Sequence, residues 1–166
     1  PYLPRAFSVA RWHDGVAEYM LEDVGPGTNR LCELEEGDEI WTLGPLGQGF
    51  RPPRDGRRPV LVGGGVGIAP LAIWQDVLAV PHTVLLGFRD AAHAEGAQLM
   101  RDAEIATDDG SVGHHGYVTQ LIPDDHIEVY ACGPPLMLEA VRALCEERGV
   151  PAQLALESGM ACGFGA

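Results

Sequence analysis

The 166-residue sequence is poor in basic residues and lacks long apolar runs. It has 11 Lys and Arg against 24 Asp and Glu, which gives a formal net charge of −13. This balance argues against non-specific binding to nucleic acid or to an anionic membrane, and we expect phosphate groups to be bound by local backbone amides. The longest apolar stretch, around residues 60–74, is interrupted by glycines and by Pro70, so no segment is predicted to span a membrane.

Cysteines are also few and irregularly placed. Cys32, Cys132, Cys145 and Cys162 form no C-x-x-C pair. A disulfide framework is untypical of a chain with so large a core, so reduced thiols and a cytoplasmic location are predicted. There is no signal peptide, repeat or low-complexity tract. The first residue is Pro1 rather than Met, and we expect the sequence to be part of a longer chain.

The N-terminal third is predicted to be rich in β-structure. Strands are expected at 6–13, 16–22 and 38–43, with a short helix from Thr28 to about Leu34. These strands are fewer than a closed barrel needs, so early barrel strands are expected to be missing from the sequence. Residues 51–59, RPPRDGRRP, are typical of an interdomain linker.

After the linker, strands alternate with helices. Strands are predicted at 60–64, 83–88, 103–107, 127–132 and 153–157, and helices near 67–79, 94–101, 117–122 and 134–148. A hairpin-like connection is expected before the helix at 117–122. Alternation of continuous apolar strands with helices predicts a parallel sheet covered on both faces.

Two glycine-rich turns follow strands of this unit. GGGVGIAP, residues 63–70, opens a helix, where Gly65 and Gly67 would let the backbone approach a pyrophosphate at the helix N-terminus. Ile68 stands at the third glycine position of the strict dinucleotide fingerprint, so a turn without a ligand is the alternative. CGPPLM, residues 132–137, ends another strand and should face the same crevice. The pair favours a nucleotide site.

An acidic turn, ATDDGS at residues 106–111, follows a third strand. A carboxylate at such a strand end can accept hydrogen bonds from a ribose diol and repel a 2′-phosphate, which favours NAD over NADP. Asp108 and Asp109 are the candidates. An Asp-Gly turn with solvated carboxylates is the alternative.

Two N-terminal motifs are further candidates for phosphate binding. RAFS places Arg5, Phe7 and Ser8 on one predicted strand, and Arg5 could pair with a phosphate. The alternative is an edge-strand arginine beside a core phenylalanine. GPGT, residues 25–28, places Thr28 at a predicted helix N-cap, a second place for a pyrophosphate. Trp12, Trp41 and Trp74 are predicted to be packing residues.

The sequence ends in LESGMACGFGA, residues 156–166, which places Cys162 among small and glycine residues. Iron–sulfur loops present thiolates from irregular backbone at close spacings such as C-x4-C-x2-C. A lone cysteine is otherwise a small buried hydrophobe, so the ending alone leaves both interpretations open.

In their order, these motifs resemble those of the ferredoxin-reductase-like flavoproteins and, within them, of the electron-transfer subunits of class 1B dihydroorotate dehydrogenases. The two glycine turns are shared across the superfamily, whereas LESGMACGFGA resembles the start of a loop that binds a [2Fe–2S] cluster. The resemblance covers essentially the whole chain. It implies an incomplete FAD-binding β-barrel at 1–52, an NAD-binding α/β domain at 53–156 and the start of the iron–sulfur loop at 157–166.

The resemblance also implies a role for each candidate residue. Those implied for FAD are Arg5, Phe7, Ser8, Gly27 and Thr28. Those implied for the nicotinamide nucleotide are Gly65, Gly67, Pro70, Cys132, Gly133 and Pro134, with Asp108 and Asp109 near the adenosine ribose. Cys162 is implied as the first cluster ligand, and the remaining ligands are expected beyond Ala166.

The implied function is electron transfer in pyrimidine biosynthesis. An FMN-containing partner subunit would oxidise dihydroorotate and pass single electrons through the cluster to FAD, and from there to NAD+. One alternative is another NAD(P)H-dependent FAD reductase subunit that serves a hydrogenase, a sulfite reductase or an oxygenase. Another is a non-catalytic module that binds flavin or nucleotide as a redox sensor.

Overall fold

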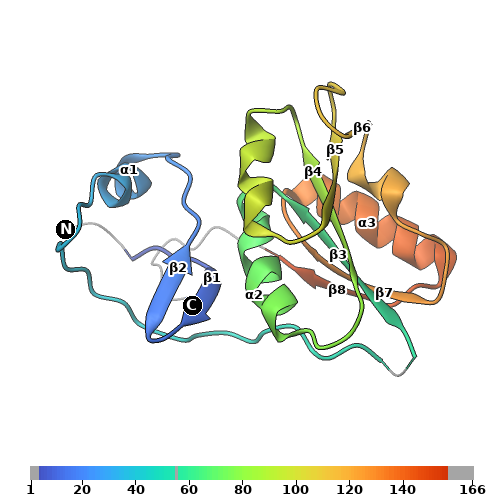
Figure 1. Ribbon diagram of the computed structural model, residues 1–166, viewed down its shortest axis with the longest axis horizontal. Helices are drawn as coiled ribbons and strands as arrows, with labels where there is room; N and C mark the ends of the chain where they lie inside the picture. Colours follow the sequence, from blue (N-terminus) through green and yellow to red (C-terminus); the bar gives the residue numbers. More distant parts are fainter. Residues whose placement is uncertain (1–3, 55, 157–166) are drawn as a thin grey trace.

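The computed structural model describes residues 4–54 and 56–156, and its largest element is a six-stranded sheet. The strands in spatial order are β6 (His114–His115), β5 (Ala103–Thr107), β4 (Thr83–Phe88), β3 (Arg58–Gly64), β7 (Ile127–Cys132) and β8 (Ala152–Ala155). Every neighbouring pair is parallel, which confirms the predicted parallel sheet (Figure 1).

Helices cover both faces of the sheet. One face carries η1 (Gly65–Ile68), α2 (Ala69–Val77) and η2 (His93–Leu99), and the other carries η3 (Val118–Leu121) and α3 (Pro135–Arg148). Successive residues of β3 pack in opposite directions, because Val60 and Val62 belong to the core beneath α3 and Leu61 to the core beneath α2. This double burial explains why the strand is apolar without alternation. No helix of the described residues is long and apolar enough to cross a membrane.

The N-terminal residues form a two-stranded antiparallel ribbon of β1 (Val9–His13) and β2 (Val16–Tyr19), followed by helix α1 (Pro26–Cys32). Asp14 and Gly15 both have positive φ, as a tight hairpin turn requires. The strand pairing stops at Val9 opposite Tyr19. The RAFS motif therefore precedes β1, and the prediction that it lies on the strand is wrong.

Residues 38–43, which were predicted to form a strand, have no strand structure. A strand needs a neighbour for its backbone N–H and C=O groups, and none of the described strands pairs with this segment. Ile40 and Leu43 are exposed, and Trp41 is fully exposed. Trp12 is also 64% exposed, so only Trp74 of the three tryptophans is the packing residue that the sequence predicts.

Two other connections differ from expectation in detail. The helix predicted at 94–101 is the 3₁₀ helix η2. The segment before η3, predicted to be hairpin-like, instead adds the short edge strand β6, which pairs with β5 in the parallel sense. The glycines at 110 and 113 both have positive φ, which lets the chain double back within a few residues.

Phe50 and the first residue of the predicted linker, Arg51, lie against the sheet. The Phe50 ring packs with Trp74 and Tyr130, with ring centroids 6.0 and 5.5 Å away. The Tyr130 hydroxyl donates a hydrogen bond of 3.1 Å to the carbonyl of Arg51. Burial of this phenol, together with the negative charge of Glu128, raises the pKa of Tyr130 to about 12. Residues 50–51 are thus anchored beside β7.

Hydrogen bonds from β7 and β8 extend this anchor. The Arg51 amide donates to Gln153 Oε1 at 2.8 Å, and Gln153 Nε2 donates back to the Arg51 carbonyl at 3.1 Å. The Arg54 amide donates to Glu128 Oε2 at 2.9 Å, and Glu128 Oε1 accepts from Gln153 Nε2 at 3.0 Å. The buried Glu128 carboxylate is thereby hydrogen-bonded at both oxygens, as a buried charge requires. The domain boundary near residue 52 stays a prediction.

We expect Phe50→Ala to lower the free energy of unfolding by about 2–3 kcal/mol, because it removes a half-buried ring from an aromatic cluster. Trp41→Ala provides a matched control, since Trp41 is fully exposed and its loss should change stability by less than about 0.5 kcal/mol. Urea titration followed by circular dichroism measures both. Equal effects of the two substitutions would contradict the proposed anchoring of residue 50.

Candidate functional site

The order of the strands places a crevice between β3 and β7. Strands β4 and β5 lie on one side of β3 in the sheet, and the later strands β7 and β8 lie on its other side. Ligands of open parallel sheets bind beyond the carboxyl ends of the strands at such a reversal. Gly64 and Cys132 are the last residues of the two central strands, and both are followed by the predicted glycine turns.

The two turns lie in direct backbone contact. A Cβ atom added at Gly67 would lie 2.5 Å from both the Cα and the N atom of Gly133, which is closer than real Cβ atoms come to backbone. One at Gly64 would lie 2.9 Å from the Met137 sulfur. The prediction that GGGVGIAP and CGPPLM face one crevice is therefore supported by geometry, and glycine at position 67 is required for the contact.

The cleft formed by the two turns has a volume of about 390 Å³, and we call it the glycine-turn cleft. Its lining residues are Glu22, Gly64, Gly65, Val66, Gly67, Gly133, Pro134, Pro135, Leu138 and Leu156. Among the residues that the structure describes, this wall is backbone and apolar side chain, with Glu22 its one charged group. η1 runs directly into α2, where the Ala69 amide donates to the Val66 carbonyl. The amides without a partner within the helix are therefore those at the start of η1, and amides at a helix start bind anions.

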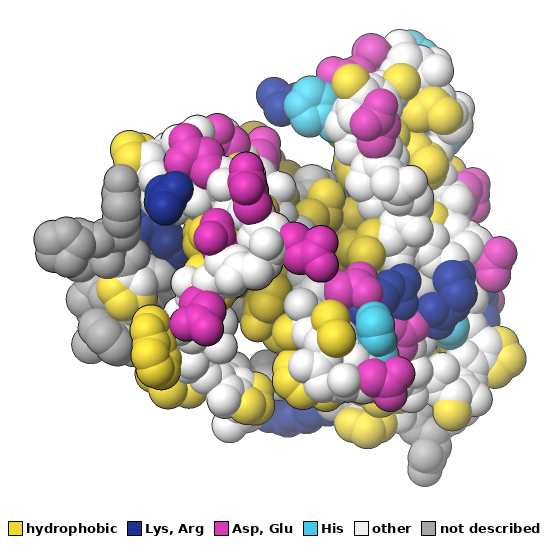
Figure 2. All heavy atoms as spheres, turned by 60° about the vertical axis from the view of Figure 1, so that its left-hand side comes forward, with side chains coloured by type: hydrophobic (Ala, Val, Ile, Leu, Met, Phe, Trp, Pro, Cys, Tyr) yellow, Lys and Arg dark blue, Asp and Glu magenta, His cyan; other side chains and the backbone are white. Residues whose placement is uncertain are grey.

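A larger hollow of about 530 Å³ lies at the opposite ends of the strands, near Arg57, His126 and Arg148. Its arginines already hold the local structure together. Arg57 donates to the Ile127 carbonyl at 3.0 Å, and Arg148 bonds the Ile122 carbonyl at 3.0 Å. The glycine-turn cleft, at the strand ends where ligands of this fold bind, is the better candidate. Figure 2 shows a hollow between the N-terminal part and the α/β unit, with hydrophobic side chains inside it and acidic side chains beside it.

The two N-terminal candidate motifs are brought together. A Cβ atom added at Gly27 would lie 2.8 Å from Nη2 of Arg5, so the Arg5 guanidinium lies over the first turn of α1. Gly27 is buried by this contact. An arginine fork beside a turn with glycine backbone is suited to a phosphate group. Phe7 is half-buried and Ser8 exposed just before β1.

Thr28 has a different role from the one predicted. It is the third residue of α1, and Gly25 is the N-cap. The Thr28 hydroxyl accepts hydrogen bonds from the Val24 and Gly25 amides at 3.0 and 3.1 Å and donates to the Gly25 carbonyl at 3.0 Å. The N-cap prediction is therefore wrong, because helix α1 begins two residues earlier than the sequence predicts. Thr28 holds the turn in shape from inside the helix.

The acidic turn after β5 contains two carboxylates with different surroundings. Asp109 Oδ1 accepts hydrogen bonds from the Ser111 hydroxyl at 2.6 Å and from the Ser111 amide at 2.9 Å. These bonds hold the pKa of the Asp109 carboxyl below its ordinary value of 3.8. Asp108 is exposed beside it. Asp109 thus shapes the turn, and Asp108 is the carboxylate better placed to meet a ligand.

A cluster after β4 was not predicted from the sequence. His93 Nδ1 hydrogen-bonds Asp90 Oδ1 at 2.7 Å, and His93 Nε2 lies 2.7 Å from Nη2 of Arg89. The hydrogen bond from His93 lowers the pKa of Asp90. The Ala91 amide donates to the Ser111 hydroxyl at 2.7 Å, which joins this loop to the acidic turn. The signal in the sequence is the Arg89-Asp90 pair directly after Phe88, with His93 three residues after Asp90.

The remaining candidates lie where the motifs predict. Pro70 is the second residue of α2, and Cys132 is buried at the end of β7. Gly133 and Pro134 lead into α3. Cys162 lies outside the described residues. Within residues 4–54 and 56–156, no group of three or more His, Cys, Asp or Glu side chains is placed to hold a metal ion.

Solved structures identify the class of the fold. The chain superposes with a TM-score of 0.71 and 28% identity on the NADH-dependent reduced ferredoxin-NADP oxidoreductase, over 99% of this chain and 70% of that one. It matches the FAD/NAD-binding domain of nitric oxide dioxygenase from Vibrio cholerae in fold, with a TM-score of 0.68 and 22% identity over 91% of this chain and 76% of that one. These matches show that the chain has a ferredoxin-reductase-like fold.

Sequence comparison identifies the family. The chain is 34% identical, over its full length and 69% of the relative, to the dihydroorotate dehydrogenase B (NAD(+)) electron transfer subunit of Clostridium acetobutylicum. It belongs to the family of dihydroorotate dehydrogenase B electron transfer subunits, which confirms the resemblance of its motifs. No model of a protein family matches the chain.

Gly67→Ala should lower the free energy of unfolding by about 1–3 kcal/mol, because the added methyl group overpacks the contact between the two turns. Gly49→Ala is the control, since a Cβ atom at Gly49 meets no atom within 4 Å. Thermal unfolding of both variants checks this. A Gly67→Ala variant as stable as the control would show that the turns are able to separate at no cost.

Proposed function

We propose that this chain passes electrons to NAD+ from a partner subunit that oxidises dihydroorotate, by way of a [2Fe–2S] cluster and FAD. The observation that carries the proposal is the glycine-turn cleft, whose two turns match the nucleotide motifs in a chain that is 34% identical to a named electron transfer subunit. The pathway would be pyrimidine biosynthesis, and the location the cytoplasm.

The chemistry of the cleft supports a nicotinamide dinucleotide as its ligand. The contact of Gly67 with Gly133 leaves backbone, rather than side chains, facing the space where a pyrophosphate would lie. Asp108, exposed at the end of β5, would accept the hydroxyls of an adenosine ribose and repel a 2′-phosphate. We therefore assign NAD, rather than NADP, to this cleft.

The Arg5–Gly27 contact fits a second phosphate, that of FAD. The guanidinium is held over buried backbone, and the residues that follow it, Phe7 and Ser8, lead into β1. A bound flavin accepts or donates electrons one or two at a time, whereas a nicotinamide exchanges them as hydride. The protein's own task is then to orient the two cofactors and to exclude water from between them.

The cluster and the partner are the finer parts of the proposal. Cys162, outside the described residues, would be the first cluster ligand, as the motif around it suggests. The partner would be an FMN-containing catalytic subunit, because dihydroorotate oxidation releases two electrons and the cluster accepts them singly. The name of the relative as an electron transfer subunit supports a hetero-oligomer.

The test uses the full-length protein purified with FAD. NADH should bleach the flavin absorbance at least about 100-fold faster than NADPH, because one extra phosphate must be held near Asp108 at a cost of a few kcal/mol.

Reduced protein should also give the paramagnetic resonance signal of a [2Fe–2S] cluster, which Cys162→Ser abolishes. Co-purification with an FMN protein that reduces NAD+ from dihydroorotate would support the partner. Reduction through a ferredoxin or oxygenase partner instead would favour the alternative reductase function.

Glu22 provides a second test, directed at the oxidation state of the nucleotide. The nicotinamide ring of NAD+ carries a positive charge that NADH lacks, and Glu22 is the one charged group that residues 4–54 and 56–156 contribute to the lining of the cleft. Removing a partly solvated charge of this kind is worth about 0.5–1 kcal/mol. Glu22→Gln should therefore raise the Kd of NAD+ about two- to fivefold and leave the Kd of NADH unchanged.

Asp23→Asn is the matched control for this measurement. Asp23 is the next residue, carries the same charge and bonds Asn29 at 3.2 Å, but it does not line the cleft. Equilibrium titration of both nucleotides with each variant gives the four constants needed. If Glu22→Gln weakened the binding of NADH as much as the binding of NAD+, an electrostatic role of Glu22 would be contradicted.

A further inference from the structure

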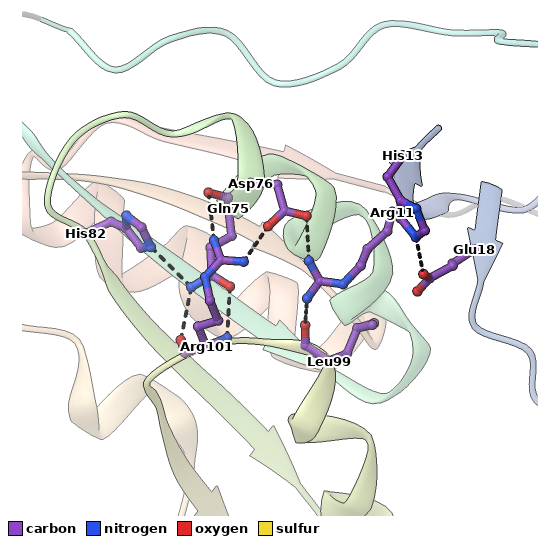
Figure 3. Close-up of polar contacts among 8 residues, drawn as sticks. All are labelled: Arg11, His13, Glu18, Gln75, Asp76, His82, Leu99 and Arg101. Atoms are coloured by element: carbon purple, nitrogen blue, oxygen red, sulfur yellow. Dashed lines mark hydrogen bonds and ion pairs between the residues drawn. The ribbon is translucent and has the colours of Figure 1, made fainter. Parts of the chain in front are cut away.

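Three charged side chains from distant parts of the sequence form one ionic cluster (Figure 3). Asp76, near the end of α2, places Oδ2 2.5 Å from Nη1 of Arg11 on β1. Its other oxygen, Oδ1, accepts a hydrogen bond from Nη1 of Arg101, just before β5. We call this cluster the Arg11–Asp76–Arg101 bridge. Each carboxylate oxygen of Asp76 therefore binds a different arginine.

The Arg11 side chain spans more than one element. Its second nitrogen, Nη2, donates to the carbonyl of Leu99 at the end of η2. Arg11 leaves the ribbon and contacts α2 and η2 together, and its side chain is only 23% exposed. A guanidinium binds two acceptors in a fixed geometry, which an ammonium group cannot do. The bridge thus fixes direction as well as distance.

Buried polar contacts hold the receiving side of the bridge in place. Gln75, 2% exposed, accepts from the Arg101 amide through Oε1 and donates to the Arg101 carbonyl through Nε2, both at 3.0 Å. Partial burial acts to raise the pKa of Asp76, but the hydrogen bonds from Arg101 and Arg11 outweigh it and lower the pKa. The carboxylate is therefore an ionised, oriented acceptor for Arg11.

The apolar contacts beside the bridge fix the orientation of the ribbon less strictly than the ionic contacts do. Ala10 is 2% exposed beneath the ribbon, and a Cβ atom added at Gly96 would lie 2.7 Å from the terminal methyl of Met20. Methionine adapts readily to the shape of its neighbours. These contacts hold the ribbon against the α/β unit, but they tolerate rotation that the ionic bridge does not.

The bridge joins the two elements that carry the cofactor motifs. β1 begins directly after RAFS, and α2 begins directly after the first glycine turn. We propose that the Arg11–Asp76–Arg101 bridge positions the flavin-binding residues relative to the glycine-turn cleft, so that Arg11 and Asp76 are positioning residues for electron transfer between flavin and nicotinamide. This inference rests on the proposed function.

Loss of the bridge should change the rate of electron transfer between flavin and nicotinamide more than the free energy of unfolding. Ion pairs with this degree of exposure contribute little to the free energy of unfolding. A displacement of about 1 Å between reacting groups, in contrast, is able to cost about 100-fold in rate. Loss of the bridge should thus slow the transfer step while cofactor binding, which each part performs with its own residues, is retained.

The experiment compares Arg11→Met, Asp76→Asn and the double variant in the full-length, FAD-loaded protein. We expect kcat for NADH-dependent flavin reduction to fall about tenfold in each single variant, a fraction of the loss for a 1 Å displacement. KM for NADH and the FAD content should change less than twofold. The double variant should be no slower than either single one, because the same contact is lost in all three.

Two further variants separate positioning from general damage. Arg11→Lys keeps the charge but lacks the rigid fork that fixes Asp76 and Leu99 in one geometry, so its kcat should lie between those of Arg11→Met and the wild type. Arg142→Met removes an exposed arginine that pairs with Glu139 and Glu146 on α3, and it should match the wild type. The charge-transfer absorbance between flavin and nicotinamide should weaken in Arg11→Met, in Asp76→Asn and in the double variant, and should be unchanged in Arg142→Met.

Amide hydrogen exchange in the apoprotein gives a readout that needs no cofactor. Exchange of β1 amides should be faster in Arg11→Met and Asp76→Asn than in the wild type, and exchange of α3 amides should be unchanged. Unchanged kcat in both variants, or a double variant whose loss is the product of the two single losses, would overturn the inference. A wild type that is not reduced by NADH would instead refute the proposed function, and the exchange of β1 would then still decide whether the bridge holds the ribbon.

Discussion

The backbone contact between Gly67 and Gly133 is the constraint on which the site depends. With no side chain between them, the turns after β3 and β7 close against each other at the point where the sheet reverses its direction of growth. At this contact the cleft is therefore bounded by peptide groups, which approach a ligand more closely than side chains allow. Changing either residue would alter the cleft from its base rather than at its rim.

The attachment of the N-terminal residues follows a different physical principle. The ribbon is held to the α/β unit by an ionic bridge and a methionine, whereas the segment that begins at Phe50 is held by aromatic packing and by hydrogen bonds to β7 and β8. All 11 basic residues of the chain are arginine, and Arg11 uses the forked geometry that this residue offers. Two independent attachments leave little freedom between the parts of the molecule.

The parallel sheet and its two glycine turns could be predicted from the sequence because they depend on local patterns. A continuous apolar strand such as 60–64 indicates burial on both faces of the sheet, and the glycines of each turn are adjacent in the sequence. The strand at 38–43 could not be decided in this way, since strand formation requires a neighbour, and Trp41 has none among the described residues. The sequence places Thr28 at the N-cap, whereas the structure has it as the third residue of α1. A hydroxyl is able to bond free backbone groups at the helix start from either position, so the residue type alone does not decide between them.

The site features that the sequence did not reveal depend on contacts between distant residues. Arg11 and Asp76 are 65 residues apart, and nothing around either one marks it as a partner. Glu22 was not recognised for the same reason, because only folding brings it to the turns at 64–67 and 133–135. Periodicity and motif spacing contain no information about such pairs, which arise when a ribbon packs on a helix.

The uneven exposure of the tryptophans gives the molecule a built-in optical probe. Trp12 and Trp41 are 64% and 103% exposed, so a water-soluble quencher reaches both of them. Trp74 is half-buried, contacts Phe50 and Tyr130, and has its indole nitrogen shielded without a hydrogen-bond partner. With the outer two quenched, the residual emission comes from the single indole that lies where α2, β7 and residue 50 meet. The intensity and wavelength of this emission therefore report how α2, β7 and residue 50 pack together during folding or cofactor binding.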